Sequence, residues 1–270
     1  MTTTVAMHRA PRWWAVAREQ VRVVGLLLRG AGLVLLTVSS ALVAFSVFQV
    51  VSEASSAPSG PHAVTNFTFT PEVSVVMAFL SLIIPLMVWR DEDPLQRGYH
   101  WVMPVSRRAH ALARVFAGWV WSMVATLALL LSIVLLTVVV ERMTGQPQRY
   151  HADFHAWEWL VPFTSATICY LFASAAAVGT RRPLIWIFGV IAIYAGSILV
   201  LLERGMTEQA ISVMTVWGGY LGGRAATWGV INSFDGKFLD PVRWLGASSL
   251  WGGTAFLLLA LVASRYREGA

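Results

Sequence analysis

The chain has 270 residues, of which 57% are hydrophobic and only 13% are charged. A soluble domain carries about 25% charged residues, so this composition excludes an ordinary soluble fold and indicates a polytopic membrane protein with one membrane domain. The net charge of +6 does not indicate nucleic-acid binding, because the basic residues stand at the ends of apolar runs and not on one polar domain.

The first predicted element is an amphipathic helix over residues 13–29. Trp13 and Trp14 open a series of apolar residues at helical spacing, whereas Arg18 and Arg22 fall mostly on another face. This pattern is typical of a helix in the membrane interface, with tryptophans toward lipid and arginines toward phosphate. The alternative is a cytoplasmic extension of the first span, and we favour the interfacial helix.

Six apolar windows without charges follow, and about 20 apolar residues suffice for a helix to cross a hydrocarbon core about 30 Å thick. The windows are Gly30–Ser52, Val73–Trp89, Val115–Val140, Trp159–Thr180, Pro183–Leu202 and Trp244–Ser264. We therefore predict an all-α, polytopic membrane protein with six transmembrane helices. Residues 1–29 form a cytoplasmic tail and the interfacial helix, and residues 30–270 form the six-helix transmembrane domain.

Basic residues predict the orientation of these spans. With a cytoplasmic N-terminus, fourteen arginines fall in inner segments and six basic residues in outer segments. Cytoplasmic segments carry such an excess, so both termini are predicted to be cytoplasmic and the number of spans to be even. Residues 203–243, with paired glycines and scattered charges, are predicted to form a short re-entrant helical hairpin. A seventh span is the alternative, but it would place Arg265 and Arg267 outside.

The chain carries little of the chemistry that an intramembrane enzyme needs. No HExxH motif is present, and His151, Asp153 and His155 are better explained as a solvated outer loop than as a metal site. The phosphate-binding pattern GxxxxGK[ST] fails around Lys237, the only lysine. No Asp, Glu, Lys or Arg lies in the middle of a predicted span, so no proton relay is evident. We expect no metal or cofactor in this chain, and any ATP hydrolysis must occur on another subunit.

The segment between the second and third windows, residues 90–114, is unusually charged for this chain. Asp93 is a good helix cap and Pro94 suits a first helical turn, so a short helix is expected to begin here and to end before Pro104. Ser106 is placed to cap the next helix, which leads into the third window. This segment is cytoplasmic in the predicted topology.

The segment resembles the cytoplasmic loop of ABC-2-type transporter permeases, where an acidic start is followed by a Leu-Pro-Val-Ser-Arg-like turn into the third span. The matching elements here are Arg90-Asp91-Glu92-Asp93 and Met103-Pro104-Val105-Ser106-Arg107-Arg108. The six-span layout, the interfacial helix and the broken hairpin before the last span are also similar. Arg114 stands where a Gly-Lys pair is common, and the loop opens with Asp-Glu-Asp-Pro, so the subfamily and the cargo stay open.

The resemblance implies the permease subunit of an ATP-driven ABC exporter or flippase for a hydrophobic or amphipathic cargo, in a bacterial plasma membrane. It implies three partners: an ABC ATPase subunit that binds ATP and Mg²⁺, a second permease copy or paralogue, and the lipid bilayer. The residues expected to couple to the ATPase subunit are Asp91, Glu92, Asp93, Pro94, Arg97, Tyr99, Pro104, Ser106, Arg107 and Arg108.

Two interpretations compete with this one. Without the resemblance, the acidic residues are solvated loop charges and the arginines are topology anchors. A separate hypothesis is that the chain is a non-transporting membrane scaffold or an assembly subunit of a larger complex. An intramembrane enzyme is disfavoured, because the predicted spans contain no histidine and no acidic residue.

Overall fold

The computed structural model describes residues 13–56, 71–89, 107–144, 160–180, 182–207, 209–210 and 241–265. In these residues the long elements are α1 (Trp13–Ser56), α2 (Pro71–Trp89), α3 (Arg107–Thr144), α4 (Val161–Gly179), α5 (Pro183–Glu203) and α9 (Pro241–Arg265). Each of the six predicted windows falls on one of these helices. The described residues contain no strand, so the all-α prediction is confirmed for this part of the chain.

Proline and glycine set several helix boundaries. α2, α5 and α9 begin at a proline, and Pro162 lies in the first turn of α4, where its missing N–H costs no helical hydrogen bond. α5 ends in a turn at Gly205, whose φ of 71° favours glycine. The amides of Gly205 and Met206 donate to the carbonyls of Leu202 (3.0 Å) and Leu201 (2.9 Å), which satisfies the last carbonyls of the helix.

Three helical stretches are long and apolar enough to cross a membrane: Arg108–Ser132, Pro183–Glu203 and Ser248–Arg265. Leu80–Trp89 and Phe163–Gly179 are shorter apolar helices. The described residues therefore support a helical membrane protein with three candidate spans, which is fewer than the six that the apolar windows predict.

α5 is the helix with the strongest lipid-facing character. Its 21 residues match the thickness of a bilayer core, at a rise of about 1.5 Å per residue. Ile198 is its one residue recorded as buried, and Ile193 is 76% exposed. A helix that is apolar on all sides and exposed is suited to the hydrocarbon core, because exposing so much apolar surface to water is unfavourable.

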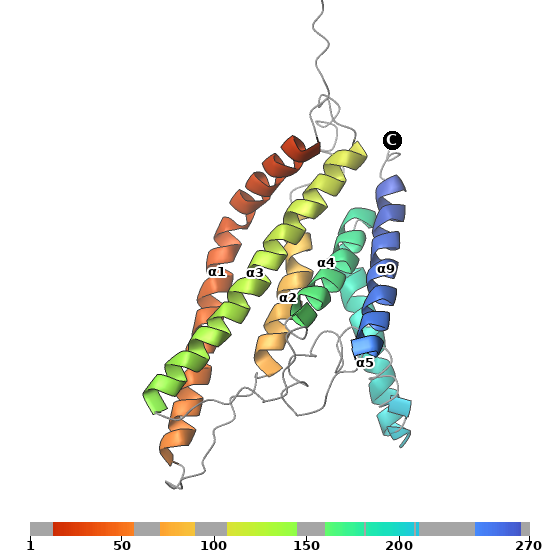
Figure 1. Cartoon of the computed structure of the whole chain (residues 1–270). Helices are drawn as coiled ribbons and strands as arrows, with labels where there is room; N and C mark the ends of the chain where they lie inside the picture. Colours follow the sequence, from red (N-terminus) through yellow and green to blue (C-terminus); the bar gives the residue numbers. More distant parts are fainter. Residues whose placement is uncertain are drawn as a thin grey trace, which may run out of the picture.

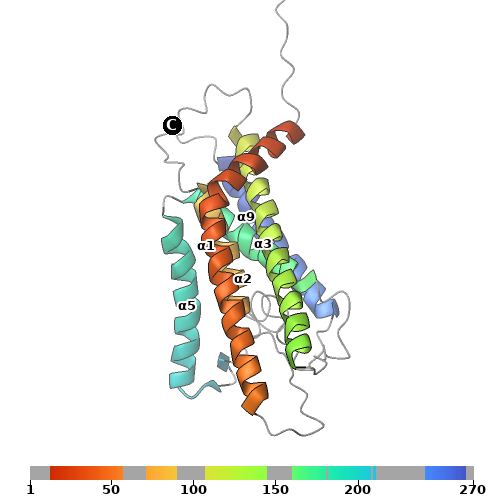
Figure 2. The same cartoon turned by 90° about the vertical axis from the view of Figure 1, so that its left-hand side faces the viewer.

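α1 and α3 are longer than a bilayer core. The 44 residues of α1 span about 66 Å and the 38 residues of α3 about 57 Å, against about 30 Å of hydrocarbon. α1 runs through the predicted boundary between residues 29 and 30 without a break. Figure 2 shows that its first part runs at an angle to the rest of the helix. The predicted interfacial helix is therefore the N-terminal arm of α1, residues 13–29, and it is continuous with the first apolar window.

The apolar face of the N-terminal arm has a protein partner. Ala17 and Val24 are buried, and Val21 and Leu28 pack against the same buried cluster, in which α3 is the main contact of α1. The amphipathic pattern in the sequence is thus real, but much of its apolar face lies on α3. The interfacial interpretation had assigned that face to lipid.

The helices alternate in direction, so the start of α1 and the end of α9 lie at the same end of the bundle (Figures 1 and 2). The end of α2, the start of α3 and the end of α4 lie there too (Figure 1). This end carries Arg18, Arg22, Arg29, Arg107, Arg108, Arg114, Arg182 and Arg265. We call it the basic end, and it is the end that the excess of arginines predicts to be cytoplasmic.

Two glycines let helices approach closely at the basic end. α4 packs against α2, α3, α5 and α9, and α1 packs against α3. A Cβ on Gly118 of α3 would collide with the hydroxyl of Tyr170 and would lie 3.2 Å from Val88. A Cβ on Gly25 of α1 would lie 2.6 Å from the indole of Trp121. Glycine at these positions lets neighbouring side chains lie directly on a helix backbone, as is common between membrane helices.

Replacing Gly118 with alanine should destabilise the bundle by about 1–3 kcal/mol, the usual effect of overpacking, although alanine has the better helix propensity. The midpoint of unfolding by sodium dodecyl sulfate, measured on the full chain in mild detergent, reports this. Gly32→Ala is the matched control, because its Cβ would meet nothing within 4 Å. Tyr170→Phe removes the colliding oxygen, so the double variant should lose less than the sum of the two single losses. Additive losses would contradict the proposed collision.

Candidate functional site

Most residues of the predicted coupling loop lie outside the described residues. This applies to Asp91, Glu92, Asp93, Pro94, Arg97, Tyr99, Pro104 and Ser106. Arg107 is the first residue of α3, as expected if Ser106 precedes the helix as its cap, and Arg108 is exposed. The structure therefore describes the two ends of this loop, at Trp89 and at Arg107, and both lie at the basic end of the bundle (Figure 1).

The two ends of the loop are joined by Arg114. Its Nε donates to the carbonyl oxygen of Val88 at 3.0 Å, and its Nη2 donates to the same oxygen at 2.6 Å. Its guanidinium carbon lies 5.5 Å from the centroid of the Trp89 ring, within cation–π distance. Val88 is in the last turn of α2, where carbonyls have no partner within the helix. Arg114 of α3 therefore caps the end of α2.

Arg114 is 8% exposed and is the one buried side chain with a permanent charge in the described part of the chain. Burying a guanidinium is costly unless carbonyl oxygens or aromatic faces replace its water. Here the carbonyl of Val88 and the ring of Trp89 both do so. This pairing fixes the distance between the two helices that bear the ends of the loop.

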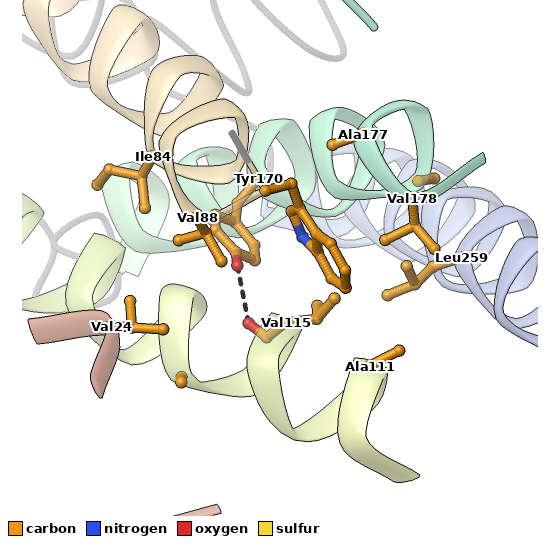
Figure 3. Close-up of a cluster of buried hydrophobic side chains, with 12 residues drawn as sticks. Val24, Ile84, Val88, Ala111, Val115, Tyr170, Ala177, Val178 and Leu259 are labelled. Atoms are coloured by element: carbon orange, nitrogen blue, oxygen red, sulfur yellow. Dashed lines mark hydrogen bonds between the residues drawn. The ribbon is translucent and has the colours of Figure 1, made fainter. Parts of the chain in front are cut away.

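Tyr170 joins α4 to the same junction. Its side chain is fully buried, and its hydroxyl donates to the carbonyl oxygen of Val115 at 2.8 Å, one residue after Arg114 (Figure 3). Figure 3 also shows Val24 of α1 and Val88 of α2 near this bond. The surrounding buried cluster consists of Val24, Ile84, Val88, Trp89, Ala111, Val115, Ala117, Tyr170, Ala175, Ala177, Val178 and Leu259. It draws residues from α1, α2, α3, α4 and α9, so five helices share one core at the basic end.

α1 is fixed to α3 by two aromatic contacts. The indole nitrogen of Trp121 donates to the carbonyl oxygen of Val21 at 2.9 Å, across Gly25. The ring of Trp14 meets the ring of Phe116 edge to face, with centroids 6.4 Å apart. The stretch of α3 from Arg114 to Trp121 thus holds α1, α2 and α4. We call this stretch, with Val88, Trp89 and Tyr170, the α2–α3 junction.

The predicted interface anchors lie on the N-terminal arm of α1. Trp13 and Trp14 are 40% and 71% exposed, and Arg18 and Arg22 are exposed as well. Their exposure agrees with a role at a membrane surface.

No metal site is found among the described residues, which contain no group of three or more potential His, Cys, Asp or Glu ligands. His151, Asp153 and His155, weighed above as a metal site, lie outside these residues, as does most of the predicted hairpin over 203–243.

Sequence reasoning missed the role of Arg114. The sequence shows it only as one of fourteen arginines in the predicted inner segments and as a departure from the pattern of ABC-2-type permeases. The available signal was its position: it directly precedes the third apolar window and follows Arg107 by seven residues, two turns inside the expected helix. A charge so placed needs a buried partner, but the partner is a backbone carbonyl that hydropathy cannot indicate. For Tyr170 and Trp121, the sequence shows only large aromatic side chains and does not indicate their hydrogen bonds to other helices.

No model of a known protein family matches this chain, and comparisons with curated proteins and with solved structures find no match either.

Replacing Arg114 with leucine should lower the free energy of unfolding by about 1.5–3 kcal/mol, the usual value of a hydrogen bond to a charged group. Arg114→Lys should lose less, because lysine keeps the charge and a donor nitrogen but lacks the planar fork that reaches Val88 and the surface that stacks on Trp89. Arg108→Leu is the control, because Arg108 lies six residues earlier on α3 and its side chain is exposed. Detergent-induced unfolding of the full chain measures all three, and equal losses for positions 108 and 114 would rule out the capping role.

Proposed function

We propose that this chain is the membrane-spanning permease subunit of an ATP-driven exporter or flippase of the ABC-2 type. A separate nucleotide-binding subunit would hydrolyse ATP, and the permease would move a hydrophobic or amphipathic cargo. The observation that carries the proposal is the double hydrogen bond from Arg114 to the Val88 carbonyl. The resemblance of the loop between α2 and α3 to the coupling loop of such permeases supports the same function.

A coupling loop must transmit a push to the spans on both of its sides. If α2 and α3 were loosely packed, pressure on the loop would be absorbed by relative motion of its two ends. With Arg114 bound to the last turn of α2, a displacement of the loop moves both helices as one unit. Tyr170 and Trp121 extend the unit to α4 and α1 through bonds to Val115 and Val21. ATP-driven closure of a partner would then shift several spans together.

We propose six spans with both termini in the cytoplasm, in the plasma membrane of a bacterium. Three supporting observations are the alternating helix directions, the arginine-rich basic end and the three candidate spans of the described residues. α2 and α4 are the shorter apolar helices, and their burial among neighbours reduces the lipid-facing length that each needs. A pair of such subunits, identical or similar, would enclose the cargo path.

Changes in the loop should disrupt coupling to the ATPase. The variants Asp93→Lys and Arg107→Glu reverse charges expected to face the ATPase subunit, and each should weaken its binding about tenfold, the effect of about 1.4 kcal/mol. The measurements are co-purification with an ABC ATPase expressed together with the chain, and cargo-stimulated ATP hydrolysis in proteoliposomes. The double variant Glu141→Lys/Arg142→Glu at the opposite end of α3 is the control and should have no effect.

The outcome of that experiment also separates the two interpretations. If both loop variants retain ATPase binding and coupled hydrolysis, the loop is not the coupling element. If the wild-type chain is isolated in a stable complex that contains no ATPase, a scaffold or assembly role replaces transport.

The topology has its own test, because Cys169 is the only cysteine of the chain. In a Cys169→Ala background, Ser59→Cys should react with a membrane-impermeant maleimide in intact spheroplasts. Gln96→Cys should react only after the membrane is permeabilised. Labelling of position 96 from outside would place the loop on the wrong side for a cytoplasmic ATPase.

A further inference from the structure

The N-terminal arm of α1 uses much of its apolar face against protein, and this changes how it can attach to a membrane. Ala17 and Val24 are buried, and Trp121 of α3 covers the backbone between Val21 and Gly25. An interfacial helix usually gains its affinity by sinking such a face into the acyl boundary. In this chain that face is largely occupied, so contact with lipid must come mainly from other side chains of the arm, namely its arginines, Trp14 and the exposed Leu26 and Leu27.

The free face of the arm carries a ridge of arginines. Arg18, Arg22 and Arg29 are exposed, and their spacings of four and seven residues are close to one and two turns of helix, so the three side chains share one face. Glu19, the one acidic residue of the arm, lies three residues before Arg22 and therefore borders the ridge on one side. The ridge sets three positive charges beside this one negative charge.

The ridge ends where the first apolar window begins. Arg29 directly precedes Gly30–Ser52, so its side chain stands at the boundary of the hydrocarbon region and can extend toward the headgroups. Trp14 lies one turn before Arg18 and is 71% exposed, as expected for an aromatic residue at headgroup depth. A lipid phosphate is the anion that occurs at this depth.

From this arrangement we infer that Arg18, Arg22 and Arg29 form a binding site for the headgroup of an anionic phospholipid, with Trp14 packed beside it. Bidentate guanidinium–phosphate hydrogen bonds and the negative potential of the leaflet supply the affinity. Because Trp14 and Val21 contact Phe116 and Trp121, lipid binding also stabilises the pairing of α1 with α3. The inference does not depend on an ATPase partner and holds for either a permease or a scaffold.

The opposite end of the bundle offers a matched control. Arg142 and Arg204 are exposed there, but each directly follows an acidic residue, Glu141 or Glu203. Each of these positions therefore has one arginine and one acidic residue, whereas the ridge has three arginines and one acidic residue. If lipid bound to any exposed arginine, changing Arg142 and Arg204 would weaken lipid binding as much as changing Arg18 and Arg22.

The test is lipid titration of the full chain in a neutral detergent, with bound lipids counted by native mass spectrometry. Phosphatidylglycerol should bind more tightly than phosphatidylcholine, and the preference should fall at high salt. Arg18→Gln/Arg22→Gln should weaken phosphatidylglycerol binding by about fivefold per arginine, on the order of 25-fold in all. Arg142→Gln/Arg204→Gln should change it less than about twofold. Phosphatidylglycerol should raise the melting temperature of the wild type and of the control variant, but not of Arg18→Gln/Arg22→Gln.

Four outcomes would overturn the inference. Equal binding of the two lipids by the wild type would remove the headgroup preference. Equal losses in the two double variants would show a diffuse effect of net charge. Full competition by soluble glycerol 3-phosphate would indicate a site for a free phosphate. Circular dichroism of both variants checks that they fold, which is expected because all four side chains are exposed. If Arg18→Gln/Arg22→Gln keeps its lipid but loses a protein subunit, the ridge is a protein contact.

Discussion

The arrangement of helices at the basic end depends on one buried guanidinium. Arg114 lies next to Val115 of the core that five helices share, and the carbonyl of Val88 and the face of Trp89 replace the water around its charge. A carbonyl in the last turn of a helix has no helical partner, so α2 would need water or a cap at this position in any case. The contact therefore offsets two costs of burial, that of the guanidinium charge and that of the unpaired Val88 carbonyl. Removing the arginine leaves a buried carbonyl without these donors, whereas removing α2 would leave a buried charge.

The same stretch of α3 organises the neighbouring helices by similar means. Tyr170 and Trp121 each donate a hydrogen bond to a backbone carbonyl of another helix, and each lies across a glycine. Polar hydrogens on large aromatic rings reach a helix backbone only where no Cβ intervenes, so Gly118 and Gly25 are part of the contact. In a membrane, where apolar packing alone gives little preference between lipid and protein, such bonds and close approaches specify which helices pair.

The sequence predicted the helices well and their partners poorly, for a physical reason. Hydropathy reports how each residue partitions on its own, and this identified an apolar window in every one of the described helices. The bond of Arg114 joins residues 26 positions apart, and that of Trp121 joins residues 100 apart. No local pattern encodes such distances. The amphipathic pattern of residues 13–29 likewise revealed an apolar face, but periodicity is the same whether lipid or α3 covers it.

On α1 and α3, the buried side chains that the structure describes lie toward the basic end. After Val24 of α1 and after Leu130 of α3, none of the side chains that the structure describes on these helices is buried. Toward the opposite end, both helices present apolar residues such as Phe45 and Leu135, which are 58% and 64% exposed. Such exposed apolar surface on two neighbouring helices is suited to contact with lipid or with another apolar protein surface. The bonds of Arg114 and Trp121 that select helix partners lie toward the basic end instead.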